Sequence, residues 1–193
     1  MGKEDVKKWL IKAILEIIPI MIGVYLGFLV SDWGTARDRH EQSQVLIESI
    51  KAEIKANRAL LTKVVDYHTV LRDSSTHYFN NPDPGLSKPG YFQGVQILPL
   101  SDSAFRTGIQ TGIINELPLS QIQALNKLYT AQEMFNNYGS IILSGVVSLD
   151  MSDKAETYRR MNGFLMMTMN DVVSLERNLI ASYGKMFDDL EAK

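Results

Sequence analysis

Glu16 is the side chain in this sequence with the clearest potential for chemistry, because it is a carboxylate in an apolar stretch. It is the only charged residue between positions 13 and 30. An ionisable group at membrane depth is costly by a few kcal/mol and is therefore a candidate for function. At about 100° per helical residue, one face of a helix here would be small or polar. That face holds, besides Glu16, the residues Lys12, Gly23, Gly27 and Gly34.

Three roles for Glu16 are compatible with this pattern. In the first, Glu16 pairs with Lys12 or extends to the membrane interface. In the second, it is buried against another transmembrane helix. In the third, it handles protons or ions. The GxxxG spacing of Gly23 and Gly27 favours the second role, because small residues let helix backbones approach closely in lipid. The third role is similar to that of the accessory subunits of proton-driven motors, which have a basic tail, one carboxylate-bearing helix and an extracytoplasmic domain. Those subunits carry an aspartate and outer strands, so the similarity is one of architecture.

No residue pattern in the sequence is typical of an enzyme or a metal site. Cysteine is absent, the three histidines form no HExxH or i, i+4 pair, and there is no G-x-S-x-G or glycine-rich phosphate loop. His68 is expected to pack in a helical seam. Methionines at helical spacing are expected to fill the core rather than bind a soft metal; they are Met161, Met166, Met167 and Met169. We expect a non-enzymatic protein with no metal and no other cofactor.

The charge distribution argues against nucleic acid as a partner. The formal net charge is -2, and residues 32–193 carry 16 basic and 19 acidic side chains. A nucleic-acid interface requires an excess of basic side chains, and residues 32–193 have no such excess.

A hydrophobic helix at residues 9–33 is expected to position Glu16. Trp9 and Trp33 lie at its ends, about 36 Å apart at helical rise. A hydrocarbon core is about 30 Å thick, and tryptophan prefers its two interfaces. The sequence therefore predicts one transmembrane helix. Its apolar span is longer than the core of a typical signal peptide, which favours a retained anchor over a cleaved signal.

The lysines before this helix predict its orientation. Residues 1–8 and Lys12 contribute four lysines, whereas only Arg37 and Arg39 closely follow the helix. By the positive-inside rule, residues 1–8 form a short basic cytoplasmic tail and residues 34–193 lie outside the cell inner membrane.

A long polar helix is expected over residues 35–72. No Pro or Gly interrupts this range, and apolar residues recur at alternating steps of three and four, with Asn57 and His68 at the remaining positions. This extracytoplasmic seam would form a coiled coil between subunits or one face of an intramolecular bundle, and further apolar residues beside it favour the bundle. The apolar seam residues are Ile47, Ile50, Ile54, Leu61, Val64 and Leu71.

The remainder is expected to be helical apart from a Pro/Gly-rich loop at residues 80–100, with a short strand at 93–98. Two or three further helices are expected after the loop. Their expected caps are Ser101 or Asp102 with an end near Gly112, Ser120 with Gln123, and Asp153 with Glu156. The fold class is therefore all-α: one N-terminal transmembrane helix continues into a long helix, which packs with the later helices in an extracytoplasmic bundle.

Several motifs follow one another in a recognisable order. Residues 22–27 (Ile-Gly-Val-Tyr-Leu-Gly) lead into Trp33, an arginine-rich turn and a long Glu/Lys helix at 47–61. Residues 104–107 and 111–114 form a second signature. The arrangement resembles an uncharacterised group of small bacterial single-pass membrane proteins with an N-terminal transmembrane helix and a helical outer domain. This resemblance implies the architecture and carries no activity.

We therefore predict a non-enzymatic, membrane-anchored, self-associating helical module that acts as scaffold, sensor input or accessory subunit of a membrane complex. The alternative is a small oligomeric channel or transport component whose pore is lined by Glu16, Gly23 and Gly27. Neutralising Glu16 separates the two, because a pore would change its ion selectivity whereas a scaffold would change only its assembly. Membrane lipid and further copies of this chain are the expected partners, and a larger membrane protein is a further candidate.

Overall fold

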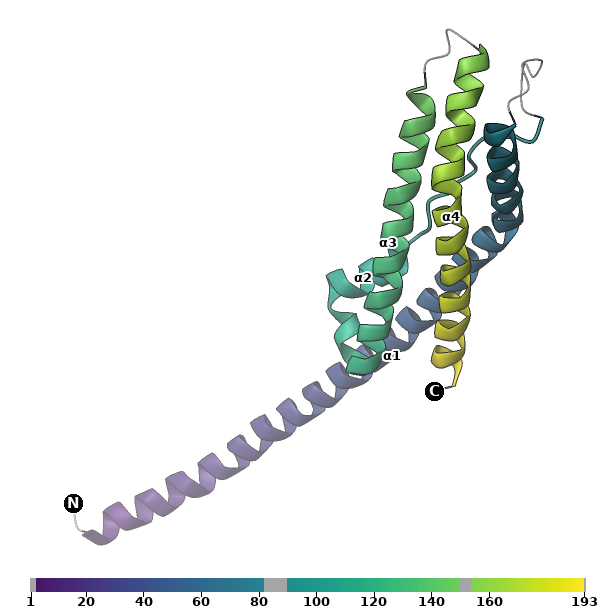
Figure 1. Ribbon diagram of the computed structural model, residues 1–193. Coiled ribbons are helices and arrows are strands. Elements are labelled where there is room, and N and C mark those ends of the chain that lie inside the picture. Colours follow the sequence, from purple (N-terminus) through teal and green to yellow (C-terminus); the bar gives the residue numbers. More distant parts are fainter. Residues whose placement is uncertain (1–2, 82–89, 150–153, 193) are drawn as a thin grey trace. The chain divides into compact units, whose positions relative to one another are not determined.

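The computed structural model is helical and describes residues 3–81, 90–149 and 154–192, with side chains from residue 15 onward and, in the last stretch, from residue 156. Its regular elements are α1 (Lys3–Asn80), α2 (Ser103–Thr111), the 3₁₀-helix η1 (Ile113–Glu116), α3 (Leu119–Val147) and α4 (Lys154–Glu191) (Figure 1). No strand occurs in these described ranges. The predicted all-α class is confirmed.

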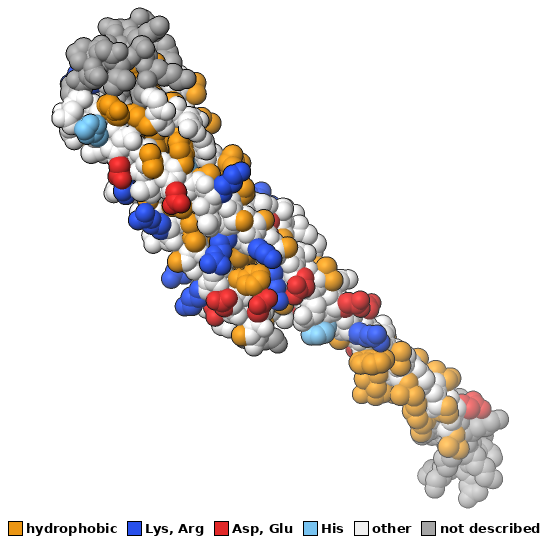
Figure 2. All heavy atoms as spheres, turned by 90° about the vertical axis from the view of Figure 1, so that its right-hand side faces the viewer, with side chains coloured by type: hydrophobic (Ala, Val, Ile, Leu, Met, Phe, Trp, Pro, Cys, Tyr) orange, Lys and Arg blue, Asp and Glu red, His pale blue; other side chains and the backbone are white. Residues whose placement is uncertain are grey.

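The chain divides into two compact units, Met1–Val45 and Leu46–Lys193, and α1 contributes to both. In the first unit, the large apolar side chains from Leu15 to Val30 are between 47% and 67% exposed, and Trp33 is 70% exposed. Figure 2 shows hydrophobic side chains gathered around this stretch. The most apolar 18-residue window of α1 has a mean hydropathy of 1.7, and none of it is buried within the chain. One N-terminal helix is therefore long and apolar enough to cross a membrane.

The second unit buries a single hydrophobic core. It is built from the second half of α1, the segment before α2, and helices α2, η1, α3 and α4. In Figure 1, α3 and α4 run side by side in opposite directions. The largest fully buried apolar or aromatic side chains are Ile50, Ile54, Leu61, Leu71, Leu125, Phe135, Ile142, Leu165, Met169 and Tyr183.

The apolar seam of α1 packs into this core. Ile50, Ile54 and Leu61 are buried and Val64 is 8% exposed, whereas Ile47 is half-buried at the edge of the core. The buried seam residues belong to the same hydrophobic cluster as residues of α3 and α4 in the second unit, so they are removed from water without a neighbouring subunit.

The ends of α2 agree with the expected ones, whereas the start of α3 differs. α2 ends at Thr111, and Gly112 caps it with a left-handed φ of 73°, as predicted. Asp102 occupies the expected N-cap position, but its carboxylate makes no cap bond and pairs with Arg106 instead. The hydroxyl of Ser101, the other expected cap, accepts from the Ser103 amide at 3.4 Å. α3 begins at Leu119, before the expected cap Ser120, because the carbonyl of Pro118 already accepts the first amides and proline suits a helix start. Asp153 lies outside the described residues.

The expected strand at residues 93–98 is wrong. Residues 92–102 run as irregular chain along the second unit (Figure 1), and we call residues 90–102 the strap. Gly94 and Gln96 have left-handed φ values of 93° and 51°, which break the extended backbone that a strand needs. The strap also passes close to α3, since a Cβ at Gly139 would lie 2.5 Å from Ile97 Cγ2.

Candidate functional site

The predicted membrane face is open within this chain. Glu16 is exposed, and a Cβ added at Gly23, Gly27 or Gly34 would meet no atom within 4 Å. Lys12 lies on α1, but its side chain is outside the described residues. This face is therefore available for lipid or for another helix, and the chain supplies no partner for it in the described residues.

A buried polar network in the second unit is the most highly organised side-chain cluster in the described part of the chain. Its centre is Glu53, one residue before the seam residue Ile54 on α1 and only 9% exposed. The Oε2 atom of Glu53 lies 2.9 Å from Ser101 Oγ, 3.0 Å from Ser103 Oγ and 3.0 Å from the Ala104 amide. Glu53 therefore caps the N-terminus of α2 from a different helix, where a carboxylate is stabilised by free amides and the helix dipole.

The other oxygen of Glu53 accepts a hydrogen bond from Tyr129 of α3, with a distance of 2.7 Å. Burial, together with the Glu53 carboxylate, raises the pKa of the Tyr129 hydroxyl well above its ordinary value of 10.0. Burial likewise raises the pKa of Tyr183, and the charge of Glu53 adds to the rise. Both phenols therefore remain protonated donors at physiological pH. Glu53 receives four hydrogen bonds in all.

Three amide side chains bind the backbone of the strap where it approaches α2. Asn136 accepts from the Leu100 amide at 2.9 Å and donates to the Leu100 carbonyl at 3.0 Å. Asn57 makes the same pair of bonds to Ser101, at 3.0 and 2.7 Å. Gln132 donates to the Ser101 carbonyl at 2.8 Å. These amides replace the neighbouring strand that the strap lacks, so its buried peptide groups are satisfied without a sheet.

Gln132 also connects the strap to α4. Its Oε1 atom accepts from Tyr183 at 2.5 Å and from Asn57 at 3.2 Å, while its side chain is only 1% exposed. One glutamine of α3 thus joins α1, α4 and the strap. Because each of its polar atoms has a partner, it carries no unpaired polar group into the core.

A second buried polar contact joins α1 to α4, nearer the C-terminal end of α1. His68 Nδ1 is 2.7 Å from Glu176 Oε1 of α4, and both side chains have no exposed surface. His68 Nε2 is 2.8 Å from the Val95 carbonyl of the strap. Glu176 Oε2 is buried with no hydrogen-bond partner among the described residues. Nearby, Tyr67 donates to the Gly94 carbonyl at 2.5 Å, so neighbouring residues of α1 hold neighbouring residues of the strap.

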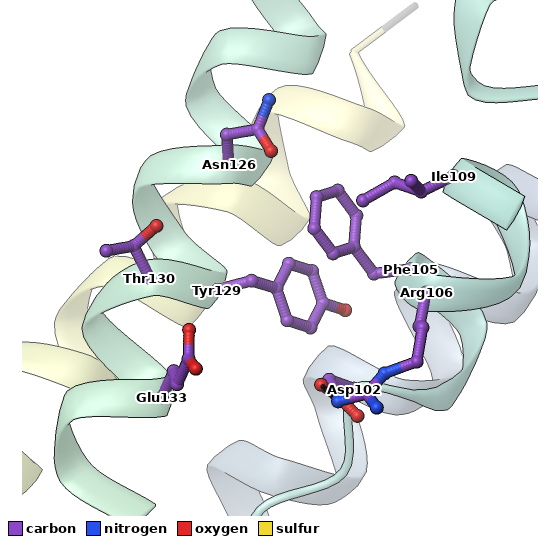
Figure 3. Close-up of a pocket in the computed structure, with 8 residues that line it drawn as sticks. All are labelled: Asp102, Phe105, Arg106, Ile109, Asn126, Tyr129, Thr130 and Glu133. Carbon is purple, nitrogen blue, oxygen red and sulfur yellow. Dashed lines mark hydrogen bonds and ion pairs between the residues drawn. The ribbon is translucent and has the colours of Figure 1, made fainter. Parts of the chain in front are cut away.

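A small pocket lies beside the Glu53 cluster, between α2 and α3. It has a volume of about 220 Å³, and Figure 3 shows the rings of Phe105 and Tyr129 facing one another at its wall. The two rings are stacked with centroids 4.3 Å apart. At the rim, the guanidinium of Arg106 is paired with Asp102 at 2.5 Å. The hydroxyl of Tyr129 is bonded to Glu53, so it is not a free donor. Ile109, Asn126, Thr130 and Glu133 complete the lining of the pocket.

The residues of this network were only partly visible to sequence reasoning. Asn57 and His68 were found as polar residues in an apolar seam, whereas Glu53, Gln132 and Glu176 were missed. Glu176 has a signal in the sequence, because it continues the apolar spacing of Val172, Leu179 and Tyr183 on one face of α4. A charged residue at such a position requires a buried partner. In the described ranges, no group of three or more His, Cys, Asp or Glu side chains could hold a metal ion.

Comparison of the chain with protein-family models, with curated proteins and with solved structures finds no match.

Proposed function

We propose that this protein is a membrane-anchored, self-associating helical module without enzymatic activity, belonging to the group of small bacterial single-pass membrane proteins that it resembles. Residues 9–33 would cross the inner membrane, residues 1–8 would be cytoplasmic, and the second unit would lie outside. In this arrangement the module serves as a scaffold, a sensor input or an accessory subunit of a larger membrane complex.

The observation that carries this proposal is the contrast in burial between the two units. The second unit buries a hydrophobic core, in which Ile50, Ile54 and Leu165 have no exposed surface. In the first unit, Ile20, Phe28 and Val30 are each about two-thirds exposed. Burying one such side chain stabilises by roughly 1.5–3 kcal/mol, so a run of them left in water is strongly unfavourable. Lipid or other transmembrane helices would cover this run.

Protease accessibility tests the orientation. We expect a protease added outside intact spheroplasts to digest the second unit, because the lysines that precede the helix favour a cytoplasmic N-terminus. The products are followed with an antibody to a C-terminal tag, and a known cytoplasmic protein serves as the control for intact membranes. Complete protection in spheroplasts, with digestion only after lysis, would reverse the topology. Release of the protein from membranes by alkaline carbonate would rule out a transmembrane anchor.

Self-association is supported by the face of α1 that holds Gly23 and Gly27, since neither glycine has a neighbour within 4 Å in this chain. Where lipid gives no hydrophobic drive, such faces associate through close backbone contact. Glu16 on the same face would either be buried between copies or line a pore. A pore is the second candidate function. It is supported by the same observation as the self-associating module, namely the open face of α1 that holds Gly23 and Gly27.

Replacing both glycines with leucine tests the association. We expect the double variant Gly23→Leu, Gly27→Leu to lower the oligomer order in nanodiscs, because the added side chains hold the backbones apart. The matched control is Val24→Leu with Leu26→Val, which changes neighbouring residues while leaving the glycine face intact. Mass measurement of the assembled particles gives the subunit number. A wild-type protein that is monomeric in several detergents and in lipid would contradict self-association.

A further inference from the structure

We propose that the strap, residues 90–102, is released from the second unit by a change in the number of protons held by the His68–Glu176 pair. The second unit would thereby respond to the pH of its surroundings. This device depends only on residues of the second unit, so it stands or falls independently of the membrane anchor.

The hydrogen bonds of His68 determine how many protons the pair holds when the strap is closed. The Val95 carbonyl can only accept, so Nε2 of His68 carries a hydrogen. The 2.7 Å bond between Nδ1 and Glu176 Oε1 then needs one further proton between them. Whether that proton rests on nitrogen or on oxygen, the pair has a net charge of zero.

The surroundings of the pair favour this one proton count over the others. Neither side chain has exposed surface, and Oε2 of Glu176 has no hydrogen-bond partner among the described residues. Loss of the proton would leave a lone pair facing a carboxylate and a net negative charge. Gain of a second proton would leave a net positive charge and an unpaired O–H group. A buried net charge without a partner is strongly unfavourable, so both changes favour the open strap.

The charged and titratable groups on the surrounding elements do not neutralise the pair. In the described structure, none of the neighbouring charged or titratable side chains makes a hydrogen bond to His68 or to Glu176. The ring of Tyr67 lies 5.5 Å from that of His68, and Arg177 reaches Thr69 rather than Glu176. These groups are Tyr67 and Arg72 on α1, Asp171 and Arg177 on α4, Tyr138 on α3, and Tyr91 on the strap.

Opening of the strap changes the proton count at both ends of the pH range. In water, an imidazole titrates near pH 6.5 and a carboxylate near pH 4.3, to within about one unit. Above about pH 6.5 the open groups hold one proton fewer than the closed pair, so opening releases a proton and becomes easier as pH rises. Below about pH 4.3 the open groups hold one proton more, so opening also becomes easier as pH falls. The strap is held most firmly between these values.

Hydrogen exchange of the strap amides in the full-length protein in nanodiscs measures this opening. After correction for the intrinsic exchange rates, we expect the opening equilibrium of the wild type to rise by about 50-fold from pH 6.5 to pH 8.5. The amides of Leu100 and Ser101, which are hydrogen-bonded in the closed strap, report it. The amides of α3 should show no comparable change. A wild-type strap whose protection is independent of pH, or one that opens only together with α3, would overturn the proposal.

The variant Glu176→Gln reverses the expected pH response. Its amide can donate to Nδ1 of a neutral His68, so the closed pair keeps its bond but no longer holds the shared proton. We expect no rise in opening from pH 6.5 to pH 8.5 and a rise of about 15-fold from pH 6.5 to pH 5.0, where only the open histidine gains a proton. The same response as the wild type would contradict the proposal.

The variant Tyr67→Phe is the control, because it removes a strap contact without removing a member of the pair. It loses the bonds of the hydroxyl to the Gly94 carbonyl and the Gln93 amide. We expect it to raise strap opening by the same factor at every pH and to leave the slope of the wild type unchanged. If Glu176→Gln does not fold, the wild-type slope and the parallel slope of Tyr67→Phe still decide the question, since a flat wild-type profile overturns the proposal.

Discussion

The substitution Ile54→Asp should unfold the second unit. Ile54 has no exposed surface and lies in the core shared by α1, α3 and α4. The introduced carboxylate would have no cationic partner there, and it would stand next to Glu53, whose oxygens are already occupied. Burying an unpaired charge costs several kcal/mol, and we expect a loss of at least about 4 kcal/mol in the free energy of unfolding. Circular dichroism and thermal melting measure it.

The matched control for this substitution is Glu48→Ala, on the exposed side of the same helix. The Glu48 side chain is 71% exposed and pairs with Lys51 one turn later, so its removal should change the stability by less than about 0.5 kcal/mol. Melting of Ile54→Asp at the wild-type temperature would mean that the seam is exposed to water and that the second half of α1 is a bare stalk.

The substitution Glu53→Ala should have the second-largest effect. It removes the acceptor for four donors, including the hydroxyl of Tyr129 and the amide of Ala104 at the start of α2. A buried donor left unpaired costs about 1–3 kcal/mol, and loss of a helix cap costs about 1 kcal/mol. We expect a total loss of about 3–4 kcal/mol by urea denaturation, with faster exchange of the α2 amides. The pKa values of Tyr129 and Tyr183 should fall, because Glu53 contributes to raising both.

Two comparisons separate the loss of charge from the loss of hydrogen bonds at Glu53. Glu53→Gln keeps one acceptor oxygen and removes the charge, so it should lose about half as much stability as Glu53→Ala. Glu48→Ala removes the same residue type from the exposed side of α1 and serves as the surface control. Equal stability of Glu53→Ala and the wild type would show that α2 and the strap do not depend on this carboxylate.

The buried polar groups explain how an irregular segment is held inside a domain whose described residues form no strand. The strap brings peptide groups next to a hydrophobic core, and each of those at Leu100 and Ser101 is bonded to an amide side chain. Side chains placed along α1 and α3 therefore decide where the strap lies. The proposed response to pH also depends on a buried polar contact of the strap, since a change in proton count would leave a net charge in the His68–Glu176 pair that binds the Val95 carbonyl.

The sequence by itself determined the elements with a strong local signal. The apolar run with Glu16, the uninterrupted range 35–72 and the glycine at 112 each predict structure from hydrophobic spacing or backbone freedom, and the helices α1 and α2 follow them. These signals are local because helix period, proline content and the left-handed region of glycine act within a few residues. They also predicted that Ile50 and Ile54 would be buried together.

Only the tertiary structure decided the contents of the polar network. Glu53 caps a helix that begins 50 residues later in the chain, and His68 meets a carboxylate 108 residues away. The sequence shows at most that His68 and Glu176 lie on apolar helix faces; it does not show which residue each of these side chains meets, because the partners lie far apart in the chain. The Asp102 carboxylate makes no cap bond at the start of α2, and Glu53 binds the Ala104 amide there instead. The strand expected at 93–98 is wrong because Gly94 and Gln96 have left-handed φ values, and Tyr67 and His68 bind this segment instead. In both places a side chain from a distant helix supplies the hydrogen bonds that local reasoning assigned to the neighbouring chain.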